Sequence, residues 1–530
     1  MGFFSGLNAE KYDRQYSDRE LVRRIAGYFR SQARRLLIVA AAIIVFSVSG
    51  AATPVVVSYG IDSLKKSGAT WEFWLIPGAV LALAVLMWLA NWVSRSITVR
   101  AINDVMLRLR TDAFASATRH DLSFYDELSS GRIVSRITSD SLDFGKLVGL
   151  VTDLVSQITE AVILGVVLVR IEWRLSLYVF AIIPVVFVLA ISYRSVVRRV
   201  TRTGMKATAN VNAAIKETVS GIAVAKNFRQ ESSIYQEFEE ANRQSFRVNL
   251  RRGLTLMTVW PSLDLIGGLA TAVLVYYGGL SAAQGLVTAG AWYLFLQSLD
   301  RFLFPVMNLS SFWTQVQNGL SAAERIFALI DAEARVVQVD NLPAPALRGQ
   351  IDFEKVCFRY SDKEQVLEDF TLHIRPGENL AVVGHTGAGK TSVAKLSARF
   401  YEFQEGRLLI DGQDIRTFDL DSYRRQLGIV SQVPFLFSGT VAENIRYARP
   451  ETGEAEIERL ARQIGSGDWL DTLPQGLQTE VGERGARLSM GQRQLVSLMR
   501  VLVQHPAIFI LDEATASIDP FTEWQIQQAL

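Results

Sequence analysis

The sequence has little cysteine, little histidine and little charge. Cys357 is the one cysteine among 530 residues, which excludes an intramolecular disulfide and a cysteine cluster for a metal. The four histidines (His120, His373, His385 and His505) have no spacing typical of zinc ligands. Only 20% of the residues are charged and the mean hydropathy is +0.19, unlike a soluble protein of this length. We therefore expect a membrane protein with more than one domain.

The apolar residues gather in the first 330 positions. Six runs there are each long enough to cross a bilayer: about 36–59, 73–93, 147–169, 175–192, 254–280 and 287–312. The N-terminus is polar and the first run is long, so we expect no cleavable secretory signal. About 35 residues precede the first run, so we expect no N-terminal peptidase domain.

Basic residues are distributed unevenly around these runs. The segment before the first run and the two long connections at 95–146 and 194–252 hold 28 Lys and Arg, whereas the three short connections hold 4. Positive residues favour the cytoplasm, so both termini are predicted to lie inside. Prokaryotic plasma membrane is the expected location, with an organelle membrane left open.

Both long connections show helical periodicity. Ile102, Val105, Met106, Leu109 and Phe114 fall near one face, as do Ile215, Val219, Ile222 and Phe228. We expect the spans to continue as helices well beyond the membrane, with these apolar faces packed.

A basic amphipathic segment precedes the first span. Residues 18–35 are predicted to lie along the cytoplasmic membrane surface with Leu21, Ile25, Tyr28 and Phe29 toward lipid. A plain soluble helix leading into the first span is the alternative.

The domain organisation follows from these patterns. Residues 1–35 form the N-terminal segment, 36–330 an α-helical six-span transmembrane domain, 331–348 a linker broken by Pro343 and Pro345, and 349–530 an α/β domain.

The α/β domain contains a phosphate-binding loop. Residues 384–391 match the pattern G-x-x-x-x-G-K-[ST], between an apolar segment at 379–384, predicted to be a strand, and a helix predicted from Thr391. Glycines let the backbone curl around a triphosphate, Lys390 would reach the β- and γ-phosphates, and Thr391 would bind Mg²⁺. The ATP contacts predicted in this loop are Gly384, Thr386, Gly387, Ala388, Gly389, Lys390, Thr391 and Ser392.

Two further motifs place polar side chains after apolar strands. Gln432 follows a strand at 427–430, where it can reach Mg²⁺ or the attacking water. The strand at 507–511 ends in two acids: Asp512 would hold the Mg²⁺ shell and Glu513 would polarise water for hydrolysis.

Aromatic and helix-start positions complete the predicted site. Tyr360 ends the first strand and can stack on adenine. Ser489, Gly491 and Gln492 open a helix, whose N-terminus favours an anion.

In this order, the motifs resemble those of the ATP-binding cassette (ABC) transporter family, exporter type. The resemblance implies ATP and Mg²⁺ as cofactors and adds Asp519 to the nucleotide site. Residues 124–136 and 217–226 resemble the two coupling regions of exporters, and 479–485 the segment that contacts them. The whole chain looks like a half-transporter similar to bacterial lipid and multidrug exporters.

Two departures from the family pattern stand out. Met490 replaces the usual middle glycine of the signature, while Ser489 and Gly491 remain, so we expect ATP binding to survive. The family continues after the acidic strand to a histidine that contacts the γ-phosphate, and no residue up to Leu530 can take that role. The domain is therefore expected to be incomplete after Asp519.

The resemblance implies a dimer in which each signature completes the partner's ATP site. A homodimer is preferred and a heterodimer is the alternative. ATP-driven export or flipping of lipids, drugs or other amphipathic molecules is the predicted function; import of a metal chelate on the same fold is the alternative. A soluble chromosome or repair ATPase is disfavoured by the six spans, and no nucleic acid partner is expected.

Ionisable residues inside spans are costly and often functional. Five residues are candidate cargo contacts for a cationic or zwitterionic molecule: Glu160, Trp260, Asp264, Asp300 and Arg301. The alternative is that the charged residues among them pair between neighbouring helices or face water.

Overall fold

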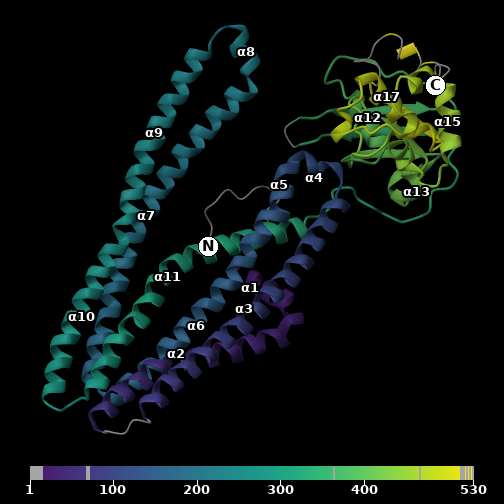
Figure 1. Cartoon of the computed structure of the whole chain (residues 1–530). Helices are drawn as coiled ribbons and strands as arrows, with labels where there is room; N and C mark the ends of the chain where they lie inside the picture. Colours follow the sequence, from purple (N-terminus) through teal and green to yellow (C-terminus); the bar gives the residue numbers. More distant parts are fainter. Residues whose placement is uncertain are drawn as a thin grey trace. The chain divides into compact units, whose positions relative to one another are not determined.

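The structure is a computed structural model that describes residues 16–66, 72–361, 364–464, 467–513, 520, 523–524 and 527 (Figure 1). It divides into two compact units. The helical unit comprises Met1–Ala117 and Gly131–Ala332, and the α/β unit comprises Thr118–Ser130 and Glu333–Leu530.

The helical unit is built from long helices, because its apolar runs contain few turn residues. Five helical stretches are long and apolar enough to cross a membrane among the described residues. The sixth predicted span lies in α11, which carries Asp300 and Arg301 and is not one of these five. The helices are α1 (Asp18–Phe29), α2 (Ala33–Lys66), α3 (Glu72–Arg119), α5 (Ser130–Ser135), α6 (Ser141–Ile171), α7 (Trp173–Ser220), α8 (Ile222–Asn227), α9 (Glu231–Met257), α10 (Val259–Ala283) and α11 (Ala289–Ile330).

The helix α11 is the centre of this unit, since it packs against α2, α6, α7 and α10. Leu164 and Leu168 of α6 and Leu294 and Phe295 of α11 are fully buried where these helices meet. Gly290 permits the close approach of α11 to α2: a Cβ there would lie 1.9 Å from the Ser58 carbonyl oxygen. The pair α7 and α9 lie side by side with α8 at their tip (Figure 1).

The predicted extension of the helices beyond the membrane is confirmed. Helices α3 and α7 each have 48 residues, about 72 Å of helix against a hydrocarbon core of about 30 Å. Val105 and Leu109 of α3 are buried as predicted, whereas Phe114, predicted on the same packed face, is 62% exposed.

The second periodic face was predicted to be packed against another part of the protein. This prediction is wrong for the single chain. Val219 and Phe228 are 66% and 67% exposed, and Ile215 and Ile222 are exposed as well. This face lies on the α7–α9 hairpin, where no helix of the described chain covers it.

The predicted lipid-facing side of the N-terminal helix is also wrong. Leu21 and Phe29 of α1 are buried in protein. Tyr28 stacks on Phe327 of α11 and donates a hydrogen bond to Asp112 of α3 at 2.9 Å. The amphipathic pattern is real, but an apolar stripe finds a protein partner as readily as a lipid one.

The α/β unit contains two sheets. Strands β1 (Ile351–Phe358), β2 (Leu367–Ile374), β3 (Glu405–Ile410) and β4 (Gln413–Asp414) form an antiparallel sheet in the order β2-β1-β3-β4. Strands β5 (Leu427–Val430) and β6 (Ile508–Leu511) pair in parallel, with Val430 opposite Leu511. Around them lie α4 (Leu122–Glu127), α12 (Lys390–Ser397), α13 (Leu420–Arg424), α14 (Val441–Ile445), α15 (Glu454–Gln463), α16 (Asp468–Asp471) and α17 (Met490–Leu502).

The strand predicted at 379–384 is not formed. Leu380 and Val382 are exposed and Val383 is 88% exposed. An apolar run becomes a strand only where a neighbour takes up its backbone hydrogen bonds, and none of the described strands pairs with this segment.

Candidate functional site

The phosphate loop has the backbone that its glycines predict. Gly387 and Gly389 have φ of +89° and +86°, values that disfavour other residues. Gly389 directly precedes α12, so the N-terminus of that helix faces the loop. The Lys390 ammonium donates to the backbone oxygens of Gly384 (2.7 Å) and His385 (3.3 Å). The lysine is thus folded over the loop that a triphosphate would fill.

The parallel pairing of β5 and β6 gathers the polar residues predicted after each strand. Thr391 donates its hydroxyl hydrogen to Asp512 at 2.9 Å. Gln432 donates to the Glu513 carboxylate at 2.8 Å, and the Lys390 ammonium lies 3.9 Å from that carboxylate. The structure therefore brings these five residues into one site, although more than 120 positions separate the first from the last.

This donor set fits Mg²⁺. The ion prefers oxygen ligands and commonly takes one or two carboxylates together with substrate phosphates. Thr391, Gln432 and Asp512 offer a hydroxyl, an amide and a carboxylate. Over the ranges that the structure describes, no cluster of three or more His, Cys, Asp or Glu could hold a metal. Phosphate and water oxygens would therefore complete the shell.

Tyr360 lies beside the phosphate loop. Its hydroxyl is 2.9 Å from the hydroxyl of Ser392 in α12, and the residue is 38% exposed. The Lys395 ammonium lies 5.5 Å from the ring centroid, and Tyr401 packs edge-on against the ring at 5.0 Å. This arrangement holds an aromatic surface next to the anion site.

The signature residues form a separate helix start. The Ser489 hydroxyl accepts a hydrogen bond from the Gln492 backbone N–H at 3.2 Å, and the Gln492 side chain accepts one from the Ser489 N–H at 2.9 Å. This capping box leaves the Ser489 O–H free to donate to an anion. No hydrogen bond or ion pair joins 488–492 to the loop at 384–391 in the described part of the chain. Asp519 lies outside the described residues.

Helix α4 belongs to the α/β unit although it precedes α6 in the sequence. The Asp121 carboxylate accepts hydrogen bonds from the backbone N–H groups of Arg335 (2.6 Å) and Val336 (2.9 Å). Burial alone would raise the pKa of Asp121, but the hydrogen bonds from Ser123 and these two amides outweigh it and hold that pKa below its usual range. Asp121 therefore stays ionised at neutral pH and ties α4 to the chain that leads into the α/β domain.

A second contact between α4 and the α/β domain was not predicted from the sequence. The Tyr401 hydroxyl donates to the Asp126 carboxylate, and burial followed by this hydrogen bond raises the pKa of Tyr401. Because Tyr401 also packs on Tyr360, one side chain contacts both α4 and the predicted adenine platform. A lone tyrosine after a helix carries no sequence signal for this role.

The candidate cargo residues are not gathered into one place. Arg301 of α11 forms an ion pair with Glu160 of α6. Glu160 is only 9% exposed. Asp264 and Asp300 are exposed and form no ion pair among the described residues. The side chain of Trp260 lies outside the described residues. The ion pair fits the alternative in which these charges pair between helices.

A bundle of membrane-spanning helices joined to an α/β unit with a phosphate loop defines a membrane protein powered by a nucleotide. Residues 36–306 match the family model of the ABC transporter transmembrane region, and residues 367–516 match the ABC transporter family model. The chain belongs to the ABC transporter family and is an exporter-type half-transporter, a multi-pass membrane protein with a cytoplasmic ATPase domain.

Three relatives illustrate the range of the family. The fatty acid ABC transporter ATP-binding/permease protein of Mycobacterium bovis is 34% identical over 85% of this chain and 72% of its own length. The ATP-dependent lipid A-core flippase of Desulfotalea psychrophila is 29% identical over 97% and 90%. The multidrug efflux ATP-binding/permease protein of Mycobacterium bovis is 31% identical over 96% of this chain and 42% of its own length.

Proposed function

We propose that this chain exports, or flips between leaflets, lipids, drugs or other amphipathic molecules by alternating access in a homodimer driven by ATP hydrolysis. The observation that carries the proposal is the convergence of Lys390, Thr391, Gln432, Asp512 and Glu513 in a chain that also carries a membrane domain of the exporter type. The printed names of the relatives, which include a fatty acid transporter, a lipid flippase and a multidrug efflux protein, support the cargo class.

Each residue of the site has a role in this proposal. Lys390 and the loop amides bind the phosphates, and Tyr360 stacks on the adenine. Thr391 and Asp512 hold Mg²⁺, which neutralises charge on the phosphates when bound. Glu513 accepts the proton of the attacking water, and Gln432 orients the Glu513 carboxylate through the 2.8 Å hydrogen bond.

The uncovered tip of the α7–α9 hairpin supports the dimer. Val219, Val224, Phe228 and Tyr235 are each more than 60% exposed there. Exposed apolar side chains that gather at one place are typical of an interaction surface. A second copy of the chain would cover them, and its Ser489 would meet the γ-phosphate held by the partner's Lys390. ATP would then favour the closed dimer, because only that state provides both halves of the site.

The contact between Tyr401 and Asp126 predicts a loss of coupling between ATP use and transport. Tyr401→Phe removes the donor of the hydrogen bond and Asp126→Ala removes the acceptor, so each is expected to lower the transport rate several-fold while basal ATP turnover stays within twofold. The double variant should be no worse than either single variant, because both remove the same interaction. The measurements are ATP turnover and cargo uptake in proteoliposomes.

Tyr447→Phe is the matched control for this cycle, because Tyr447 is 61% exposed and its hydroxyl has no hydrogen-bond partner among the described residues. Additive losses in the double variant would show that the two side chains act independently and would contradict the coupling.

Transport in inverted membrane vesicles tests the proposed direction and cargo. The cytoplasmic side faces outward in these vesicles, so export appears as ATP-dependent uptake of a fluorescent lipid or amphipathic dye. Uptake that requires ATP and is lost in Lys390→Ala is expected. Accumulation in right-side-out vesicles alone would instead support the second candidate, import on the same fold.

A further inference from the structure

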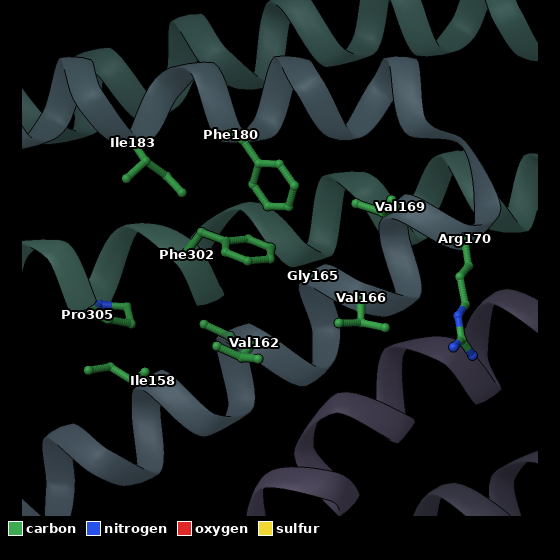
Figure 2. A pocket seen from close by; sticks show the side chains of 11 residues that line it. Ile158, Val162, Gly165, Val166, Val169, Arg170, Phe180, Ile183, Phe302 and Pro305 are labelled. Atoms are coloured by element: carbon green, nitrogen blue, oxygen red, sulfur yellow. The ribbon is translucent and has the colours of Figure 1, made fainter.

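A crevice lies between α6, α7 and α11 in the helical unit (Figure 2). Its volume is about 600 Å³, and ten of its eleven lining residues are apolar. Phe180 of α7 and Phe302 of α11 meet edge-to-face with ring centroids 5.6 Å apart. Both rings face Gly165 of α6, where a Cβ would lie 3.5 Å from Phe180 and 3.6 Å from Phe302. The missing side chain of Gly165 thus keeps the space between helix and rings open.

The dimensions of the crevice suit a single acyl chain. Along α6 it extends from Ile158 to Arg170, about 18 Å of helix rise. One leaflet is half of a hydrocarbon core of about 30 Å, or about 15 Å. A methylene group is about the size of a water molecule, which occupies roughly 30 Å³ in the liquid, so the crevice holds roughly twenty such groups. Two sixteen-carbon chains, with about thirty such groups, would exceed this volume.

The charge at one end of the crevice is positive. Arg170, the one charged residue of the lining, stands at the end of α6, and Figure 2 shows its guanidinium reaching beyond the apolar side chains. In the adjoining turn, the Glu172 side chain accepts a hydrogen bond from the Arg174 backbone N–H at 3.1 Å. Glu160 is paired with Arg301. No carboxylate pairs with Arg170 in the described part of the chain, so the end of the crevice offers a free cation.

We propose that this crevice binds an amphipathic anion with one acyl chain, of the class of a fatty acid anion, with the chain along α6 and the anionic group at Arg170. One molecule binds per chain. The charge complements Arg170, and the apolar wall packs against the acyl chain. The role of this ligand as cargo rests on the proposed function, whereas its binding does not. The site also replaces the expectation of a cationic cargo, because Glu160 already has a cation beside it.

Binding is tested with radiolabelled palmitate and the purified full chain in detergent, without nucleotide. Palmitate is expected to bind with one molecule per chain. Arg170→Gln should weaken it at least tenfold, about 1.4 kcal/mol, and Arg170→Lys should restore most of it. Arg174→Gln, in the adjoining turn but outside the lining, should stay within twofold. Gly165→Leu should abolish binding by filling the space below the rings, and Gly149→Leu, where an added Cβ meets nothing, should not.

Several results would overturn the proposal. If hexadecylamine binds as tightly as palmitate, the site does not prefer an anion. If phosphatidylglycerol competes equally well, the site does not prefer a ligand with one acyl chain. Unchanged palmitate binding in both Arg170→Gln and Gly165→Leu would place the ligand elsewhere. If Gly165→Leu does not fold, Val166→Phe at a half-exposed lining position fills the same space. If the chain binds palmitate but shows no ATP-driven transport, the proposed function is refuted and the proposed binding site is not.

Discussion

Glu513→Gln is expected to lower ATP turnover at least 100-fold while ATP binding is retained. The amide has nearly the shape of the carboxylate, but it cannot accept the proton of the attacking water, and general base catalysis contributes roughly 10²–10⁴-fold to a rate. Removing the negative charge 3.9 Å from the Lys390 ammonium leaves that lysine freer to hold phosphates. The nucleotide-bound dimer should therefore accumulate. Phosphate release and retention of labelled ATP by the purified full chain measure the two effects.

Glu368→Gln is the matched control, because Glu368 lies exposed on β2, outside the site. Its turnover should equal that of the parent. Turnover above one tenth of the parent rate in Glu513→Gln would mean that another group activates the water, and the role given to Glu513 would be wrong. Loss of ATP binding in the same variant would show that the carboxylate serves the fold of the site.

Arg301→Gln is expected to destabilise the helical unit by about 3 kcal/mol, the lower end of the range for breaking a buried ion pair. The lower end applies because the Arg301 side chain is 41% exposed, whereas that of Glu160 is 12% exposed. The variant leaves the Glu160 carboxylate unpaired inside a membrane span, where an ionised group is costly. Gly50 of α2 faces the same carboxylate, since a Cβ there would lie 2.6 Å from the Glu160 Oε1 atom.

The double variant Glu160→Gln, Arg301→Gln should recover most of the lost stability, because it leaves no unpaired charge. Thermal inactivation of the solubilised chain at a fixed scan rate measures the differences. Asp264→Asn and Asp300→Asn, at exposed positions without a paired cation among the described residues, should change the midpoint little. An Arg301→Gln variant that melts with the parent would show that the ion pair adds no stability. Lost transport in a Glu160→Gln variant of normal stability would restore a cargo role for Glu160.

Local patterns of the sequence predicted much of the fold. The glycines of 384–391, the strand at 427–430 and the helix after Ser489 lie where the sequence places them, because turn residues and apolar periodicity act within a few positions. The same reasoning failed at 379–384, where the apolar run has no neighbouring strand, and at α1, whose apolar side packs on α3 and α11. Periodicity identifies an apolar face but not the surface that covers it.

The sequence by itself determined that this is a membrane protein with a nucleotide site, since six apolar runs, the bias of basic residues and the nucleotide motifs are all readable along the chain. The resemblance of those motifs, in their order, to ABC transporters added the prediction of an exporter-type half-transporter. Tertiary structure alone decided which distant side chains meet. Glu160 contacts Arg301, Tyr401 contacts Asp126, and the crevice at Gly165 draws on three helices. The physical reason is that backbone preference depends on neighbours in sequence, whereas ion pairs and cavities depend on how the helices pack.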